Sequence, residues 1–183
     1  DLRHPEAKAL VLRLASVCDA VVENFRPGTL DKFGLGYDAF REVRPDVLMV
    51  SSSTSGQRGP ERSMPGYATT FGALGGLGAI TGYEGGPATE IWDSVDMRLG
   101  TSIALTTLIG LYDRRRNGES QYVDFSSREV ISATIGDTLM SFFMNGDVVQ
   151  PKGNHDEVMA PHNCYPCAGE DQWVSIVVST DDE

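Results

Sequence analysis

Two aspartates, Asp93 and Asp96, stand where a long helix is expected to begin. The segment after them has no proline as far as Asn117, and Gly118 follows at the position where helices often end in a left-handed residue. Acids at the start of a helix lie beside unpaired N–H groups and the positive end of the helix dipole, which favour the ionised carboxylate. An ionised carboxylate can cap a helix, and it can also attack an acyl carbonyl as a nucleophile.

The residues that follow Asp96 leave both roles open. Gly100, Thr101 and Ser102 are small, so the beginning of the helix has room for a ligand or for another chain. Arg114 to Arg116 form a basic run in the last turn, and this run is interpreted as a solvated helix end. Residue type and spacing alone therefore leave two roles open for Asp96, namely helix capping and nucleophilic attack.

A second group of candidates, Asn24 to Arg26, follows an apolar segment at 20–22 that is predicted to be a short buried strand. Helices and strands alternate along the chain, which predicts an α/β unit with a parallel sheet. Ligands of such sheets bind outside the carboxyl ends of the strands, where these three residues are expected. Pro27 and Gly28 come next, so the same segment also fits a plain turn with Phe25 packed in the core.

The other expected elements follow from hydrophobic periodicity. Helices are predicted at 5–19, 29–33, 37–43, 96–117 and 126–145, and strands at 20–22, 47–51 and 121–125. Ser126 and Glu129 have the spacing of a capping box at the start of the last helix. The polar segment 51–67 is interpreted as an active-site loop, and a hairpin over 165–178 is expected to turn at 168–172.

His162, Cys164 and Cys167 raise the question of a metal site. Zinc sites usually have two ligand pairs, whereas this chain has one C-x-x-C and a more distant His155. In an extended segment, two cysteines three residues apart point to opposite faces. We therefore expect no metal site.

The composition is that of a globular protein. The chain has 183 residues, 40% of them hydrophobic, and no stretch approaches the ~18 consecutive apolar residues of a membrane span. Its net charge of -11 argues against a nucleic-acid surface. The first residues lack the features of a secretory signal and three cysteines give no disulfide framework, so a cytoplasmic location is expected. No phosphate-binding glycine motif occurs between a strand and a helix, which argues against a nucleotide-hydrolysing enzyme.

Five segments, in this order, resemble the class III coenzyme A transferases, a family that includes formyl-CoA transferases, carnitine-CoA transferases and 2-methylacyl-CoA racemases. The segments are ENFRPGTLDKFGLGYDAFREVRPDVLMVSSSTSGQRGP at 23–60, PGY at 65–67, the helix at 96–118, NGESQYVDFSSRE at 117–129 and APHNCYPCAGEDQWVSIVV at 160–178. The resemblance covers nearly the whole chain.

This resemblance implies a fold of two domains. A Rossmann-like large domain with a parallel sheet binds CoA, and a smaller α+β domain follows it. Residues 1–146 are then part of the large domain without its first strands, and residues 147–183 are the linker and the start of the small domain. Members of the family form interlocked homodimers, so a homodimer is implied for the whole protein, of which this chain would be a piece.

The resemblance also implies the chemistry. The family's catalytic aspartate precedes a glycine by four residues and begins a helix that ends in glycine, and Asp96 with Gly100 and Gly118 fits this spacing. Asp93 would need three inserted residues. In the family, the aspartate takes CoA from an acyl-CoA through a mixed anhydride and an aspartyl-CoA thioester, and another carboxylic acid then accepts the CoA. The implied substrates are acyl-CoA and small carboxylic acids, with no permanently bound cofactor. The residues implied to hold CoA are Asn24, Phe25, Arg26, Lys32, Phe33 and Tyr67.

Two alternatives stay open at this point. The racemases of the family exchange a proton beside the thioester and use a histidine as a second base, but Tyr67 occupies that position here. A tyrosine ordinarily titrates near ~10, too high for a ready base at neutral pH. The family also commonly has an acid after this tyrosine, where this chain has Ala68. A catalytically silent CoA-binding subunit is therefore the other alternative to a transferase.

Overall fold

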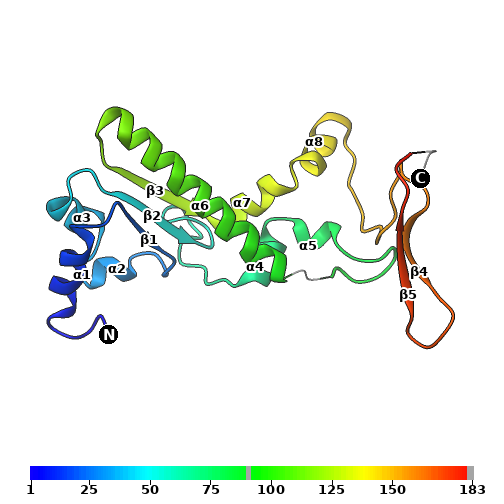
Figure 1. The fold of residues 1–183 in the computed structure, drawn as a ribbon, viewed down its shortest axis with the longest axis horizontal. Coiled ribbons are helices and arrows are strands. Elements are labelled where there is room, and N and C mark those ends of the chain that lie inside the picture. The colour runs from blue at the N-terminus through cyan, green and yellow to red at the C-terminus, as the bar shows by residue number, and fades with distance from the viewer. Residues whose placement is uncertain (90–91, 181–183) are drawn as a thin grey trace. The chain divides into compact units, whose positions relative to one another are not determined.

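The computed structural model describes residues 1–89 and 92–180, and Figure 1 shows its helices and strands. The chain divides into two compact units, which are considered separately below. Unit 1 comprises residues 1–77 and 91–136, and unit 2 comprises residues 78–90 and 137–183. The expected boundary between a large domain ending at residue 146 and a smaller domain after it stays a prediction.

Unit 1 contains a parallel sheet in the order β1–β2–β3, formed by β1 (Ala20–Glu23), β2 (Leu48–Ser53) and β3 (Gln121–Ser126) (Figure 1). The central strand β2 is buried along almost its whole length. A strand covered on both faces needs a continuous apolar run, and residues 47–50 supply one. The predicted α/β fold with a parallel sheet is confirmed.

One face of this sheet packs against α1 (Ala7–Ala15) and α3 (Tyr37–Val43), and the short α2 (Thr29–Lys32) precedes α3. Val21, Met49 and Tyr122 lie side by side across the three strands and point to this face. They pack with a buried cluster of helix and loop residues. The buried members of this cluster are Ala15, Leu35, Phe40, Val47 and Met49.

The other face is covered by the long helix α6 (Trp92–Asn117) (Figure 1). Gly110 lets this helix approach the sheet closely, because a Cβ at that position would lie 2.8 Å from both δ carbons of Leu48. The short helices α4 (Ala68–Leu74) and α7 (Ser127–Thr134) also pack against α6. Gly118 ends α6 with φ +74°, and its N–H donates to the carbonyl of Arg114 at 2.8 Å, which confirms the predicted cap.

The interpretation of Arg114 as part of a solvated helix end was wrong. Its side chain is only 13% exposed, and its guanidinium donates to the Asp19 carbonyl at 2.8 Å and to the Asp19 carboxylate at 2.7 Å. A weaker contact reaches Asp46 at 3.7 Å. The arginine therefore ties the end of α6 to the residues just before β1 and β2. Sequence cannot reveal such a contact, because Arg114 and Asp19 are far apart in the chain.

These ion pairs predict a contribution to stability that is lost in acid. The hydrogen bond and charge of Arg114 lower the pKa of Asp19, and a hydrogen bond from Arg44 lowers the pKa of Asp46. A carboxyl whose pKa is lower in the folded chain stabilises the fold above its unfolded pKa, and this contribution disappears as the pH falls through the folded pKa. We expect the melting temperature to decrease when the pH is lowered below about 4. This decrease should be smaller in Arg114→Met.

Thermal unfolding of the intact protein between about pH 5 and about pH 3 measures this difference. Arg115→Met is the matched control, since Arg115 is exposed in the same turn and makes no ion pair with any described residue. Equal acid sensitivity of wild type, Arg114→Met and Arg115→Met would contradict the prediction.

The predicted capping box at Ser126 and the single helix to Asn145 were both wrong. Ser126 is the last residue of β3, its backbone is extended, and its side chain makes no capping hydrogen bond. The helical region divides at Ile135 into α7 and α8 (Gly136–Asn145). Ser126 is paired with Ser53 in the sheet, and its buried hydroxyl has no hydrogen-bond partner, so it does not cap α7.

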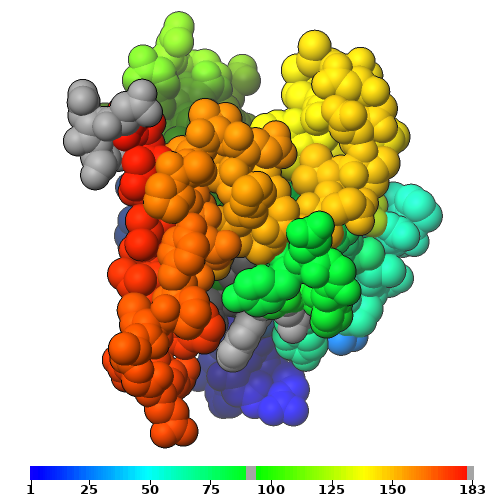
Figure 2. All heavy atoms as spheres, turned by 90° about the vertical axis from the view of Figure 1, so that its right-hand side faces the viewer, coloured from blue at the N-terminus to red at the C-terminus, as the bar shows by residue number. Residues whose placement is uncertain are grey.

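Unit 2 contains an antiparallel hairpin of β4 (His162–Pro166) and β5 (Trp173–Val177). Its turn is closed by the N–H of Cys167, which donates to the carbonyl of Gln172 at 2.8 Å, and this confirms the predicted hairpin. Every residue of β5 is exposed. Figure 2 shows this red segment at the surface. The short helix α5 (Leu77–Ile80) lies where the chain passes from unit 1 to unit 2.

Among the described residues, no helix combines the length and the apolar character that crossing a bilayer requires.

Candidate active site

A cavity of about 710 Å³ lies in unit 1 at the carboxyl ends of the strands. Its wall is formed by residues that follow β1, by the end of β2, by the loop before α4, by α6 and by the first residue of α7. This is the position at which open α/β sheets commonly bind ligands. Residues far apart in the sequence thus meet in one place.

Asp96 lines this cavity from α6. Leu99, Gly100 and Ile103 line it as well, and residues spaced by three or four along a helix share one face. The carboxylate of Asp96 is exposed and makes no salt bridge with any described residue. Its negative charge is therefore available to a ligand.

The position of Asp96 within α6 differs from the expected one. The helix begins at Trp92, so Asp96 lies in the second turn rather than at the first free N–H groups. The effect of a helix dipole falls off within the first turn, so it contributes little here. The side chain of Asp93, the competing acid, lies outside the described part of the structure.

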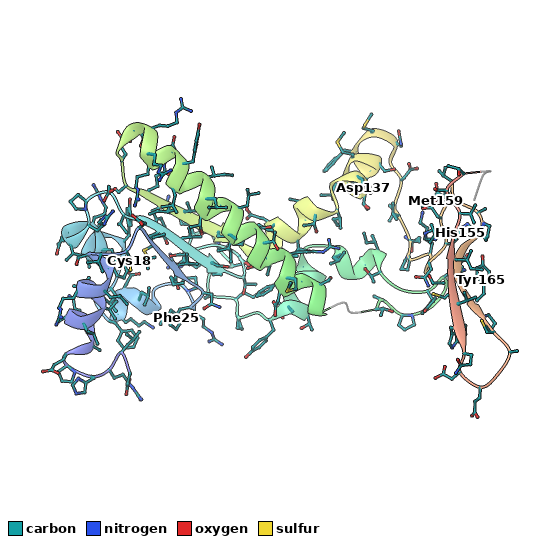
Figure 3. The ribbon with its side chains drawn as sticks, viewed as in Figure 1. Cys18, Phe25, Asp137, His155, Met159 and Tyr165 are labelled. Carbon is teal, nitrogen blue, oxygen red and sulfur yellow. The ribbon has the colours of Figure 1, made fainter. Side chains whose placement is uncertain are left out.

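Asn24, Phe25 and Arg26 line the same cavity directly after β1, where Figure 3 labels Phe25. All three are exposed, so the reading in which Phe25 packs in the core was wrong. The N–H of Phe25 donates to the Glu23 carboxylate at 2.8 Å, which holds the backbone of this turn. Arg26 makes no ion pair with any described residue, so its charge can bind an anion.

Tyr67, another residue that the family resemblance assigns to CoA, also lines the cavity, and its side chain is 78% exposed. It precedes α4 and follows Gly66, where a Cβ would come within 2.6 Å of Phe71 and Thr54 side-chain atoms. Only glycine lets the loop pass so close to the end of β2. Ala68, which stands in place of the family's acid, is buried at 8% exposure.

The loop that contributes Tyr67 is attached to α7 through Arg128. The backbone N–H of Arg128 donates to the carbonyl of Thr54 at 3.1 Å, and its guanidinium forms an ion pair with Glu61. Two points of the predicted active-site loop are thereby fixed. The wall of the cavity is built on secondary structure rather than on a free loop.

Lys32 and Phe33 do not line this cavity. Lys32 is exposed at the end of α2, and Phe33 packs against the buried cluster under α1 and α3. Lys32 makes no ion pair with any described residue and is six residues from Arg26 in the chain. Their assignment to CoA stays a prediction.

A neighbouring cavity of about 460 Å³ shares Arg26 with the first. Its other lining groups are mainly acidic or neutral, and burial raises the pKa of Tyr122, whose side chain forms part of its wall. The acidic lining groups are Glu23, Asp31, Asp38 and Glu42. Lys8 also lines this cavity, so its wall has four acids and two cations and is negative overall. Such a wall repels phosphates, so the charge of Arg26 is better placed to bind an anion from the side of the Asp96 cavity.

Sequence reasoning missed the serine and threonine hydroxyls of the cavity. Ser52 and Thr54 are two residues apart at the end of β2 and therefore lie on the same face. Ser127 begins α7 directly after β3. The signal was present, because serines end two neighbouring strands of one parallel sheet. The carboxyl ends of such strands meet at one edge, so the three residues had to lie near each other.

The residues considered for a metal site lie in unit 2. Figure 3 labels His155 there, and the described residues contain no group of three potential ligands close enough to hold a metal ion. The ring nitrogen Nδ1 of His162 lies 2.6 Å from the carbonyl oxygen of Asn154. This contact to the backbone is the hydrogen bond that the structure shows for the His162 ring.

The chain was compared with known protein families, characterised proteins and solved structures. The model of CoA-transferase family III matches residues 1–183. The succinyl-CoA–D-citramalate CoA-transferase of Chloroflexus aurantiacus is 38% identical over 182 residues, which cover 99% of this chain and 45% of that protein. The beta subunit of the succinyl-CoA–L-malate CoA-transferase of the same organism is 32% identical over 184 residues, with coverages of 99% and 45%.

A solved structure is also similar. The CAIB/BAIF family protein from Brucella suis superposes with a TM-score of 0.87 at 27% identity, over 94% of this chain and 46% of that one. This chain therefore spans about half the length of the relatives it matches.

Proposed function

Because the chain belongs to CoA-transferase family III, as its sequence predicted, we propose that the intact protein transfers coenzyme A from an acyl-CoA to a carboxylic acid, with Asp96 as the nucleophile. One observation carries this proposal. Asp96 shares a single cavity with Asn24, Phe25, Arg26 and Tyr67, which are four of the six residues that the family resemblance assigned to CoA. A plain capping role for Asp96 gives no reason for these residues to meet.

The proposed reaction proceeds in two covalent stages. An oxygen of the Asp96 carboxylate attacks the thioester carbonyl, the C–S bond breaks, and CoA thiolate leaves a mixed anhydride. The thiolate attacks the aspartyl carbonyl, releases the donor acid as a carboxylate and forms an aspartyl-CoA thioester. The acceptor carboxylate then attacks the aspartyl-CoA thioester and releases CoA thiolate, which leaves a mixed anhydride of Asp96 and the acceptor acid. The thiolate attacks the acceptor's acyl carbonyl, which forms the new acyl-CoA and frees the Asp96 carboxylate. A carboxylate nucleophile loses no proton on attack, so no general base is needed.

The lining of the cavity supports this use of Asp96. Gly100 is next to it on the same face of α6, and a Cβ there would meet no atom within 4 Å. The space beside the carboxylate is therefore open to an acyl group. Phe25 and Ile103 provide apolar contacts, which suit the hydrocarbon part of a pantetheine arm or of an acyl chain.

CoA is strongly anionic, and Arg26 and Lys32 are the proposed contacts for its phosphates. Both side chains are exposed and have no ion-pair partner among the described residues. In a protein of net charge -11, an anionic ligand needs cations near its site, and Arg26 lines the cavity itself. Phe33 has a supporting role in this proposal, because it packs beneath the turn that carries Lys32.

The proposal includes a homodimer in the cytoplasm. The exposed face of α6 carries four large apolar side chains, which water does not favour. They are Leu105, Leu108, Ile109 and Tyr112. A second copy of the protein is the proposed cover for this face, and no nucleic acid, membrane or metal takes part.

The proposed activity is tested with succinyl-CoA as donor and D-citramalate or L-malate as acceptor, because the relatives are named for these substrates. We expect the intact protein to form the new acyl-CoA, and hydroxylamine or borohydride added during turnover to modify Asp96, as detected by peptide mass spectrometry. Transfer without modification of Asp96 would assign the nucleophile elsewhere. A panel of acyl-CoA donors and acids without any transfer would refute the transferase, and deuterium uptake beside the thioester without an acceptor would indicate a racemase.

A further inference from the structure

The mechanism proposed above leaves one part of the cavity without a role. Ser52, Thr54 and Ser127, here called the hydroxyl cluster, line the cavity at the ends of β2 and β3. Ser52 is 5% exposed, Thr54 is 6% exposed and Ser127 is 2% exposed. Transfer of CoA at Asp96 requires an open carboxylate and a thioester, and the steps proposed above assign no role to these buried hydroxyls.

The hydrogen bonding within this cluster is incomplete. The Oγ atoms of Ser52 and Ser127 lie 3.5 Å apart, whereas hydroxyl hydrogen bonds are usually about 2.7–2.8 Å long. Each hydroxyl has one donor and two acceptor lone pairs, so one long contact leaves most of this capacity unused. A hydrocarbon chain against the cluster would bury these groups without compensation, which is unfavourable.

The distance from Asp96 to the cluster follows from the packing of α6. Gly110 contacts Leu48 at the start of β2, while Asp96 and Ser52 line one cavity, so α6 runs antiparallel to β2. The chain advances about 13 Å from Leu48 to Ser52 and about 21 Å from Gly110 to Asp96. Along the strand direction, Asp96 therefore lies roughly 8 Å further than Ser52. Both residues line the same cavity of about 710 Å³, which has room for a carboxylic acid of a few carbons between them.

The charges of the residues that line the cavity indicate which functional group of such an acid the hydroxyl cluster can bind. Among the described residues that line the cavity, Arg26 is the only cation, and it belongs to the turn after β1, whereas Ser52 and Ser127 belong to the ends of β2 and β3. A second carboxylate buried beside two neutral serines would lose its hydration without gaining a positive partner. A hydroxyl group can both donate to and accept from a serine, and its desolvation costs much less.

We infer that Ser52 and Ser127 bind a hydroxyl group of the acid that is bonded to Asp96, so that the protein selects hydroxy acids over the same acids without the hydroxyl. This inference rests on the proposed function, because it places the acyl group at Asp96. The two serines determine specificity and take no part in bond making. Thr54 completes the polar wall at the level of Asp96.

The test compares acids that differ by one hydroxyl, namely lactate with propionate, 3-hydroxybutyrate with butyrate, and malate with succinate. For at least one pair we expect kcat/KM of the intact protein to favour the hydroxy acid by about tenfold or more. Ser52→Ala and Ser127→Ala should each reduce this preference about tenfold, mainly by lowering kcat/KM for the hydroxy acid. The ratio is measured within one protein sample, so a partial loss of folded protein does not change it.

Ser126→Ala is the matched control. Ser126 is 8% exposed and its Oγ is buried without a hydrogen-bond partner, but it does not line the cavity. This variant should keep the wild-type preference. The inference fails if the wild type transfers CoA equally well to both members of every pair, or if the preference survives in Ser52→Ala and Ser127→Ala. Absence of transfer to every acid would instead refute the proposed function.

Discussion

Replacing Asp96 by asparagine is expected to lower kcat for CoA transfer about 10³-fold or more, with little change in the affinity for CoA. The amide has nearly the same shape as the carboxylate but lacks the charged oxygen that forms the mixed anhydride. Asp96 is exposed and makes no salt bridge with a described residue, so the change should shift stability by less than about 0.5 kcal/mol. Steady-state kinetics and a direct binding titration with CoA measure the two effects.

Asp93→Asn is the control for this experiment, because Asp93 is the other acid that the sequence offers at the same helix. We expect this control to keep most of its activity. The opposite pattern, with Asp93→Asn inactive and Asp96→Asn active, would exchange the two assignments. Loss of CoA binding in Asp96→Asn would mean that the residue supports the fold of the cavity rather than the reaction.

The position of Asp96 in the second turn of α6 changes the reason for its reactivity. At the first turn, helix N–H groups would bind the carboxylate and reduce its tendency to attack. One turn further on, those groups are already bonded within the helix, and the cavity around Asp96 is open. The family spacing predicts Asp96 as the nucleophile, and this assignment stays a prediction. The physical argument made from the sequence, a carboxylate at the helix entrance, does not hold, because α6 begins at Trp92.

Local patterns predicted most of unit 1. The segments predicted as strands became the strands of the sheet, and the apolar residues that begin the central strand β2 are buried, as a strand covered on both faces requires. The end of α6 at Gly118 was also predictable, since only glycine readily takes the left-handed conformation found there. In each case the information lies within a few neighbouring residues.

Contacts between distant segments were not predictable in the same way. Arg114 resembles a solvated residue in sequence and is largely buried against Asp19 in the structure. Ser126 and Glu129 have the spacing of a capping box, but sheet pairing places Ser126 in β3 instead. Tertiary packing overrode the local preference at both places.

The candidate site also depends on contacts between distant segments, which local patterns do not predict. Asn24 and Asp96 are 72 positions apart, and only the topology of a parallel sheet brings the ends of its strands to one cavity. Ser52 and Ser127 belong to this cavity for the same reason, and the rule that ligands bind at strand ends would have selected them. Lys32 lies beyond the cavity wall, so the family alignment predicts a contact there that the cavity does not explain.

Filling the space beside Asp96 is expected to have the second largest effect. A Cβ on Gly100 would meet no atom within 4 Å, and Gly100 lines the cavity, so the ring of Gly100→Phe should project into the proposed acyl site. We expect kcat/KM for acyl-CoA to fall about 100-fold or more, since misplacement of a reacting group by about 1 Å has effects of this size. The melting temperature should stay the same or rise, because glycine within a helix costs about 0.5–1 kcal/mol.

The neighbouring residue supplies the control. Thr101 is exposed on another face of α6, outside the cavity, so Thr101→Phe adds the same ring to the same helix and should keep its activity. Gly100→Ala adds only a methyl group and should lie between wild type and Gly100→Phe. This graded order separates blockage of the cavity from damage to the helix, because a damaged helix would lower the melting temperature of both phenylalanine variants. Full activity in Gly100→Phe would show that the acyl group does not bind beside this face of α6, and the assignment of Asp96 would then lose its geometric support.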